Sequence, residues 1–316
     1  MKILVMGAGA IGSVFGGFLA EKGNDVSFIG REQFIQAIKK VGLRISGIWG
    51  EHFVRNVKCF TSVNEISEAN FDFVLLSTKS FDTEETVKQV LTLVGPETMI
   101  VSLQNGLGNI ETIARLAGKE RTIGARVIFG VVLIEPGHFN ISASADKVLL
   151  GAISPDVPAD KVTEIAATIN NAGITTATTS EIEKFIWTKV LYNCCLNAPS
   201  ALLDTCYGKL GEFEATRKII RSIITEVLAV AKGCEVDMGF PDTASYEKVL
   251  YGELLPTTYA HHASTLQDLK SGKKTEIEAL NGAIVRMGRE KGIPTPVNWT
   301  LTQLIHGKEG IGPNPC

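Results

Sequence analysis

The sequence lacks the features that mark several large classes of protein. Its 316 residues carry 31 Lys and Arg against 34 Asp and Glu, so there is no basic field for nucleic acid. Hydrophobic residues make up 45% and charged residues 21%, which excludes a disordered or fibrous chain. No apolar run reaches the roughly 20 residues that a membrane helix needs. We therefore expect a cytoplasmic protein with neither a nucleic-acid nor a membrane partner.

Metal-binding patterns are also missing. The six cysteines form no CxxC pair and no zinc-type spacing with the five histidines. The adjacent His261 and His262 would point about 100° apart on a helix, so we expect no metal site; a place for them in a substrate cleft is left open. The cysteines are expected to be small buried hydrophobic residues in a reducing compartment, namely Cys59, Cys194, Cys195, Cys206, Cys234 and Cys316.

The first half of the chain alternates short apolar runs with helical patterns, which is typical of a doubly wound α/β domain with a parallel sheet. Brief, β-branched or aromatic runs predict buried parallel strands at Ile3–Met6, Val26–Ile29, Phe73–Ser77, Met99–Leu103 and Thr122–Val127. Helical periodicity predicts helices at Gly12–Lys22, Glu32–Val41, Thr83–Val94 and Asn109–Ala117.

The later part of the chain has a different character. Gly130–Gly151 predicts an antiparallel hairpin that closes the edge of the sheet. From Glu181 onward strand signals nearly vanish, and helices are expected at Thr216–Lys232, Ser245–Val249 and Thr275–Lys291. We therefore predict an N-terminal α/β domain over residues 1–176 and an all-helical C-terminal domain over residues 177–316.

A glycine-rich turn follows the first predicted strand. The sequence GAGAIG fits G-x-G-x-x-G between a strand and a helix, the arrangement of a Rossmann dinucleotide-binding loop. Its glycines permit a tight turn, a close approach to a pyrophosphate and close packing of helix on strand, while the helix N-terminus supplies amides and a positive dipole. The predicted cofactor contacts are Gly7, Ala8, Gly9, Ala10, Ile11 and Gly12.

The end of the second predicted strand bears on the choice of cofactor. An NAD enzyme usually has Asp or Glu there, whereas this chain has Arg31. A guanidinium suits a ribose 2′-phosphate, which favours NADPH. Two alternatives stay open at this point: a solvated surface arginine, and Glu32 turning inward to the ribose.

A single file of polar residues runs along an apolar helix in the second half. Lys189, Asn193 and Asn197 recur at every fourth position, so they share one face if the helix persists, and Pro199 is expected to end it soon afterwards. Burying an ammonium and two amides without partners is costly. The file therefore lines a solvent-facing stripe or a polar cleft, and the scarcity of other charge on this helix favours the cleft.

Six stretches occur in an order that is typical of one family. They are GAGAIG, TKS at Lys79, QNGLGN at Asn105, WTKVLYNCCLNAPSAL, STLQDLKSGKKTEIEALNG and GIPTPVN. Over essentially its whole length the sequence resembles the ketopantoate reductases, also called 2-dehydropantoate 2-reductases. Many families share the glycine loop, whereas K-x-x-x-N-x-x-x-N followed by LQD, TEI and NG is specific.

The resemblance implies a function and a set of site residues. It implies an NADPH-dependent reduction of 2-dehydropantoate (ketopantoate) to pantoate, a step towards pantothenate and coenzyme A. Lys189 would protonate the keto oxygen as hydride arrives, and Glu276 would be the second catalytic residue. Implied substrate contacts are Asn105, Lys189, Asn193, Asn197 and Ser264. Implied cofactor contacts are the Gly7–Gly12 loop, Arg31, Lys79, Asn105 and Glu276.

The chemistry asks for residues of this kind. Hydride addition places negative charge on a carbonyl oxygen, and a positioned ammonium both stabilises that charge and delivers a proton. A dry cleft lowers the pKa of a lysine whereas a carboxylate such as Glu276 opposes that shift, so the net direction for Lys189 is left open. Taken alone, each of three residues also has an ordinary structural interpretation. Glu276 could lie at a solvated helix start, Lys79 could be a charge on a surface loop, and Asn105 could be a turn residue.

One position departs from the family pattern. Where the family often has asparagine before a glycine, this chain has Tyr207 in DTCYGKL, which keeps a rival substrate open: another branched or bulky 2-keto acid. A third hypothesis is a dinucleotide-sensing protein without turnover, although Lys189 and Glu276 are both present. The expected partner is a small 2-keto acid, and a homodimer is a candidate assembly.

Overall fold

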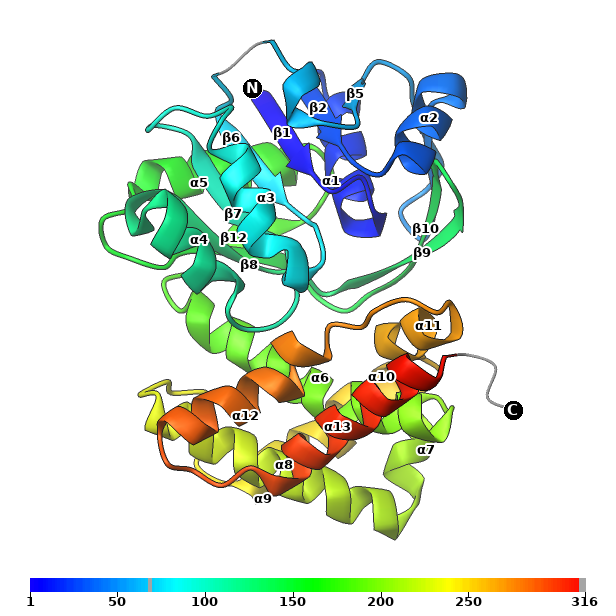
Figure 1. Cartoon of the computed structure of the whole chain (residues 1–316), viewed down its shortest axis with the longest axis vertical. Helices are drawn as coiled ribbons and strands as arrows, with labels where there is room; N and C mark the ends of the chain where they lie inside the picture. The colour runs from blue at the N-terminus through cyan, green and yellow to red at the C-terminus, as the bar shows by residue number, and fades with distance from the viewer. Residues whose placement is uncertain (68–69, 313–316) are drawn as a thin grey trace. The chain divides into compact units, whose positions relative to one another are not determined.

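The chain folds into two compact units in a computed structural model that describes residues 1–67 and 70–312 (Figure 1). The first unit comprises residues 1–104 and 109–182. The second comprises the short loop Asn105–Gly108 and the chain from Glu183 onward. The domain boundary that we predict at 176/177 stays a prediction. The class of fold, an α/β domain followed by a helical one, is confirmed.

An eight-stranded sheet forms the centre of the first unit, in the order β12-β11-β8-β7-β6-β1-β2-β5. From β5 to β8 the pairing is parallel, and β11 joins β8 antiparallel. All five predicted strands are present within one residue at their ends. The bounds are β1 Lys2–Met6, β2 Asp25–Ile29, β5 Lys58–Phe60, β6 Phe73–Leu76, β7 Met99–Ser102, β8 Thr122–Arg126, β11 Val148–Ala152 and β12 Thr176–Thr178.

Helices cover both faces of this sheet, which is why its central strands are apolar without alternation. One core contains the side chains of α1 (Ala10–Glu21), α2 (Glu32–Val41) and α5 (Ala159–Asn171). The core on the opposite face contains those of α3 (Thr83–Val90) and α4 (Asn109–Ala117). The four predicted helices are confirmed, except that α3 ends four residues before the predicted Val94.

The predicted edge hairpin does not close the main sheet. Strands β9 (Phe129–Glu135) and β10 (His138–Ser144) do pair antiparallel, but they belong to a second sheet, β4-β3-β10-β9, with β3 at Leu43–Gly47 and β4 at His52–Val54. Of the predicted segment, only β11 joins the main sheet, where it lies between β8 and β12. Along β10 the buried Phe139 and Ile141 alternate with more exposed residues, so this strand buries one face and suits a covering sheet.

Apart from loops and turns, the described residues from Glu183 onward form helices, which are coloured from green to red in Figure 1. Helix α8 packs against α7, α9, α12 and α13. The bounds are α6 Ile182–Leu203, α7 Tyr207–Glu212, α8 Glu214–Gly233, α9 Thr243–Val249, the π-turn η4 Leu250–Leu254, α10 Leu255–Thr257, α11 Ser264–Lys270, α12 Asn281–Glu290 and α13 Pro296–Ile311. Within residues 1–67 and 70–312, no helix is long and apolar enough to cross a membrane.

Two helix predictions in this unit are wrong. Helix α6 does not end near Pro199 but continues to Leu203, because its side chains are buried nearly all round and this packing outweighs the lost backbone hydrogen bond. The predicted helix Thr275–Lys291 begins only at Asn281. Before it, residues 275–280 form a turn that is held by a hydrogen bond near each end. The Thr275 amide donates to the Glu309 carboxylate, and the Leu107 amide donates to the Ala279 carbonyl.

Candidate active site

The glycine loop is shaped by close contacts inside the first unit. Gly7 has a φ of 110°, and a Cβ there would lie 2.8 Å from the backbone nitrogen of Thr78. On Gly12 a Cβ would lie 2.1 Å from the Gly7 carbonyl oxygen. A side chain at either position therefore collides with backbone, so the fold itself requires these two glycines.

Gly9 differs from its neighbours because the space around it is open. Apart from Gly9 and its two chain neighbours, no residue among 1–67 and 70–312 has an atom within 4 Å of a Cβ added there. Gly9 is the N-cap of α1, whose first backbone amides lack partners inside the helix. Open space in front of a positive helix end fits a pyrophosphate. The buried Ala8 and the half-buried Ala10 and Ile11 complete the loop.

Ser77, for which no sequence pattern predicts a role, fixes this loop. The Ser77 hydroxyl contacts the carbonyl oxygens of Gly7 at 2.8 Å and Met6 at 3.2 Å. Nearby, the Gln104 side-chain amide donates to the Thr78 carbonyl at 3.0 Å. A serine at the end of a strand is too common to be a sequence signal. Lys79, a predicted cofactor contact, follows Thr78 directly in the chain and therefore lies beside the glycine loop. Its side chain is half-buried.

Arg31 lies at the N-cap of α2 and is exposed. Its guanidinium lies 5.0 Å from the centre of the Phe34 ring, which is a cation–π distance. Glu32 occupies the first turn of the same helix. The arginine is therefore held at the end of β2 by its own helix, in the position from which the sequence predicts a contact with the cofactor.

Two of the predicted residues, Lys189 and Asn105, contact each other in the second unit. The Lys189 ammonium, on α6, donates a hydrogen bond of 2.5 Å to the side-chain oxygen of Asn105. The loop that carries Asn105 is held in turn by the segment after Glu276: the Leu107 amide donates to the Ala279 carbonyl at 2.8 Å. Gly106 allows this approach, because a Cβ there would lie 2.4 Å from the same oxygen. Lys189, Asn105 and Glu276 are all half-buried.

The asparagine file continues along α6 from this lysine. Because α6 is one helix from Ile182 to Leu203, Lys189, Asn193 and Asn197 follow one face, as predicted. Asn193 is half-buried, and Asn197 is 4% exposed. The Asn197 side-chain oxygen accepts a hydrogen bond of 2.5 Å from the Tyr207 hydroxyl, a contact that sequence spacing did not predict.

The remaining predicted substrate contact, Ser264, is the exposed first residue of α11. Its role, like the roles of the other predicted site residues, stays a prediction. Among the described residues, no group of three or more His, Cys, Asp or Glu is arranged to hold a metal ion.

The cysteines follow the prediction only in part. Cys59, Cys194 and Cys195 are buried, and burial raises the pKa of the Cys59 thiol to about 11, so it stays neutral and packs as a hydrophobic group. Cys206 and Cys234 are half-buried instead, and Cys316 lies outside the described residues.

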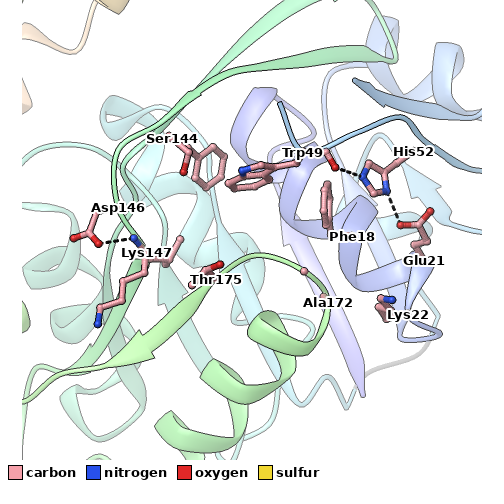
Figure 2. A pocket seen from close by; sticks show the side chains of 13 residues that line it. Phe18, Glu21, Lys22, Trp49, His52, Ser144, Asp146, Lys147, Ala172 and Thr175 are labelled. Carbon is pink, nitrogen blue, oxygen red and sulfur yellow. Dashed lines mark hydrogen bonds and ion pairs between the residues drawn. The ribbon is translucent and has the colours of Figure 1, made fainter. Parts of the chain in front are cut away.

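A separate cavity of about 500 Å³ lies in the first unit. Figure 2 shows the aromatic rings of Phe18 and Trp49 on one side of it and Lys147 on the other. His52, also in its wall, hydrogen bonds to Glu21 at 2.7 Å and to the Trp49 carbonyl at 3.1 Å. None of the predicted site residues lines this cavity.

Fold and loop together define the chain as a Rossmann-type, dinucleotide-dependent oxidoreductase with a helical second unit. The chain belongs to the ketopantoate reductase family: residues 3–155 match the family model "Ketopantoate reductase PanE/ApbA" and residues 181–309 match its C-terminal model.

Individual relatives cover nearly the whole chain. A 2-dehydropantoate 2-reductase of Aquifex aeolicus is 39% identical over 98% of this chain and 97% of its own length. A PanE/ApbA family ketopantoate reductase structure from Ralstonia eutropha is similar with a TM-score of 0.87 at 31% identity, covering 98% of this chain and 99% of that one. D-mandelate dehydrogenase with NADH and anilino(oxo)acetate matches with a TM-score of 0.88 at 26% identity and the same coverage.

Proposed function

We propose that this protein reduces 2-dehydropantoate to pantoate with NADPH, in the cytoplasm, as a step towards pantothenate and coenzyme A. Family membership and the relatives named 2-dehydropantoate 2-reductase support the reaction. The observation that carries the proposal is the 2.5 Å hydrogen bond from Lys189 to Asn105, because it orients the one ammonium of the polar file.

The lysine has the properties that the reaction needs. Asn105 is a neutral acceptor that orients the ammonium. In the proposal this ammonium stabilises the negative charge that develops on the keto oxygen and delivers the proton that completes the alcohol. Glu276 acts beside this lysine in the proposal, while Asn193, Asn197 and Ser264 hold the carboxylate and hydroxyl groups of the substrate.

The cofactor contacts in the proposal lie on the glycine loop and the two basic residues after it. The open space at Gly9 and the amides of α1 receive the pyrophosphate, and Arg31 pairs with the ribose 2′-phosphate. Lys79 lies at the ribose and nicotinamide end. When bound, NADPH supplies the hydride that the keto carbon accepts.

The experiment is a steady-state assay of nicotinamide oxidation with ketopantoate, run with NADPH and again with NADH. The proposal expects turnover of ketopantoate with NADPH and a lower kcat/KM with NADH. Binding of NADPH with no oxidation in the presence of any 2-keto acid would contradict it and support the dinucleotide-sensing alternative.

A second candidate is the same reaction on a different bulky 2-keto acid. Two observations favour it: the buried Tyr207 ring beside Asn197, and the similarity to D-mandelate dehydrogenase, whose structure holds anilino(oxo)acetate. A panel of branched and aromatic 2-keto acids in the same assay separates the two candidates. A higher kcat/KM for one of these acids than for ketopantoate would keep the reaction type and replace the substrate.

A further inference from the structure

A short segment of the second unit, residues 275–279, connects two parts of the proposed site. It carries Glu276. The carbonyl of its last residue accepts a hydrogen bond of 2.8 Å from the Leu107 amide, in the loop that carries Asn105. Asn105 in turn accepts from the Lys189 ammonium. The placement of this one segment therefore affects both Glu276 and the residue that orients Lys189.

The segment has little regular structure of its own. It contains a single 3₁₀ turn at Ile277–Ala279, and α12 begins only after it, at Asn281. A turn of this length contributes few backbone hydrogen bonds. The position of the segment therefore depends on side chains from other elements.

Glu309, near the end of α13, supplies the contact at the start of the segment. One oxygen of its carboxylate accepts from both the backbone amide and the hydroxyl of Thr275, each at 2.7 Å. The Thr275 hydroxyl oxygen accepts in turn from the Ile277 amide at 3.3 Å. Thr275 is 2% exposed and the Glu309 side chain 17% exposed, so water competes little for these hydrogen bonds.

The second oxygen of Glu309 fixes the direction of the carboxylate. It lies 2.9 Å from the His306 ring, whose other nitrogen lies 2.8 Å from the Glu278 carboxylate. Glu278 also accepts from Arg286 at 2.6 Å. Burial raises the pKa of Glu309, but the hydrogen bonds from Thr275 and then from His306 together outweigh it and leave this pKa below its ordinary value. Glu309 is therefore a charged acceptor at neutral pH, held in one orientation toward Thr275.

We propose that Glu309 is a positioning residue for the reduction: through Thr275 it holds the segment that carries Glu276 and binds the Asn105 loop. This inference rests on the proposed function and adds to it a residue on α13 that has no assigned contact with substrate or cofactor. A misplacement of about 1 Å caused by a remote substitution can cost about 100-fold in rate. Loss of the contact to Thr275 should therefore lower kcat in a protein that is still folded.

The test measures kcat and KM for ketopantoate with NADPH in Glu309→Ala and Glu309→Gln. Alanine removes both acceptor oxygens, so kcat should fall at least about tenfold while KM stays within about threefold. Glutamine keeps one oxygen as an acceptor for Thr275, and its amide nitrogen can donate to the neutral His306 ring. It should therefore retain kcat within about threefold. A loss in Glu309→Gln as large as that in Glu309→Ala would overturn the inference, because the charge and not the contact to Thr275 would then matter.

Glu247→Ala is the matched control. The Glu247 side chain, on α9, is 12% exposed, and each of its oxygens accepts from the Arg221 guanidinium at 2.9 Å. These hydrogen bonds tie α9 to α8 and do not reach residues 275–279. Denaturant unfolding measures the stability of both alanine variants, and Glu247→Ala should keep the wild-type kcat. Equal losses of kcat in Glu247→Ala and Glu309→Ala would overturn the inference, because Glu309 would then contribute to stability only.

Thr275→Val tests the same contact from the other side, even if Glu309→Ala folds poorly. Valine removes the hydroxyl and keeps the backbone amide, so kcat should fall about threefold or more. The double variant Thr275→Val/Glu309→Ala should be at most about twofold slower than Glu309→Ala, because both substitutions act on one contact. Independent losses that multiply in the double variant would overturn the inference.

The remaining outcomes separate this inference from the proposed function. Turnover of ketopantoate with an unchanged kcat in Glu309→Ala or in Thr275→Val overturns the inference and leaves the reductase intact. If the wild type prefers another 2-keto acid of the panel, the same variants are compared on that acid. Absence of turnover on the whole panel overturns the proposed function, and the inference with it.

Discussion

At the scale of single residues, the glycine loop separates the needs of the fold from those of a ligand. Gly12 is required by the fold, since its Cβ would lie 2.1 Å from a backbone oxygen. Gly9 has open space around it and an extended backbone, with φ −85° and ψ −166°, that alanine adopts without strain. If the loop binds a pyrophosphate, the absence of a side chain at Gly9 leaves room for that ligand.

This difference gives a paired prediction. Gly9→Ala should leave the unfolding free energy within about 0.5 kcal/mol of the wild type, yet weaken NADPH binding at least about tenfold. Gly12→Ala should lower the unfolding free energy by about 2 kcal/mol, because backbone has to move. Denaturant unfolding and fluorescence titration with NADPH measure both quantities. Unchanged NADPH affinity in Gly9→Ala would contradict the predicted role of the loop.

Tyr207 shows how far sequence reasoning reaches at this scale. The sequence marks it as a departure from the family pattern, because that requires only a motif and its spacing. Its hydrogen bond to Asn197 crosses from α7 to α6 around the turn at Thr205 and Cys206, so it depends on the packing of two helices. The Lys189–Asn105 bond likewise joins residues 84 positions apart. Contacts between different elements, or between residues far apart in the sequence, can be seen only in the folded structure.

At the scale of helices and strands, Glu226 on α8 caps the start of α13. Its buried carboxylate accepts from the backbone amides of Val297 at 2.8 Å and Asn298 at 2.9 Å, and from the Asn298 side chain at 2.7 Å. A negative charge at a helix N-terminus also interacts favourably with the helix dipole. The carboxylate therefore ties α13 to α8 at one end.

We expect Glu226→Gln to lower the unfolding free energy by about 2 kcal/mol, because one acceptor oxygen becomes a donor that faces other donors. Denaturant unfolding measures the difference. Glu253→Gln, at an exposed glutamate, is the control and should change it by less than about 0.5 kcal/mol. Equal effects of the two substitutions would show that the cap contributes nothing specific.

At its other end, α13 holds the turn that carries Glu276. The His306 ring lies 2.8 Å from the Glu278 carboxylate and 2.9 Å from that of Glu309. Glu309 accepts in turn from the backbone and the hydroxyl of Thr275, both at 2.7 Å. The hydrogen bonds to Glu278 and then to Glu309 raise the pKa of His306 above its ordinary value.

The sign of the resulting pH dependence follows from that shift. Because the folded state binds the His306 proton more tightly, the stabilisation is fully present below the unfolded pKa of about 6.5 and is lost as pH rises through the folded value. Partial exposure limits it to about 1 kcal/mol or less. His306→Gln should therefore destabilise the protein more at about pH 5.5 than at about pH 9. His138→Gln is the control, since it removes a ring that contacts the Ser46 hydroxyl. A loss of unfolding free energy in His306→Gln that does not vary with pH would contradict the account.

The elements that the sequence predicted well are those whose pattern is local. The parallel strands β1, β6 and β7 are apolar on both faces, and this alone distinguishes them. The errors occur where tertiary contacts prevail. Packing carries α6 past Pro199, and the ties of Thr275 and Ala279 keep that segment out of the helix predicted there.

At the scale of the whole molecule, the chain passes between its two units more than once. The short loop Asn105–Gly108 belongs to the second unit, although the strand β7 before it and the helix α4 after it belong to the first. The predicted phosphate-binding residues lie in the first unit, and the Lys189–Asn105 pair lies in the second. Cofactor binding and proton donation should therefore be separable by substitution.

Cofactor binding should stabilise the chain by mass action. At a nucleotide concentration of 100 times Kd, we expect the unfolding free energy to rise by about 2.7 kcal/mol. Arg31→Ala should raise the Kd for NADPH by at least about tenfold and leave that for NADH nearly unchanged, because only NADPH carries the 2′-phosphate. Unfolding measured with each nucleotide tests both statements. An equal loss for the two nucleotides would discard the phosphate contact at Arg31.

The most direct measurement of the central claim compares the wild type with Lys189→Ala in a single-turnover reaction of bound NADPH with ketopantoate. We predict that the variant folds and binds NADPH as tightly as the wild type but oxidises it about 10²–10⁴-fold more slowly, because the proton donor is gone. Lys232→Ala, at an exposed lysine on α8, should react at the wild-type rate. A Lys189→Ala variant that oxidises bound NADPH at the wild-type rate would contradict the assignment of Lys189.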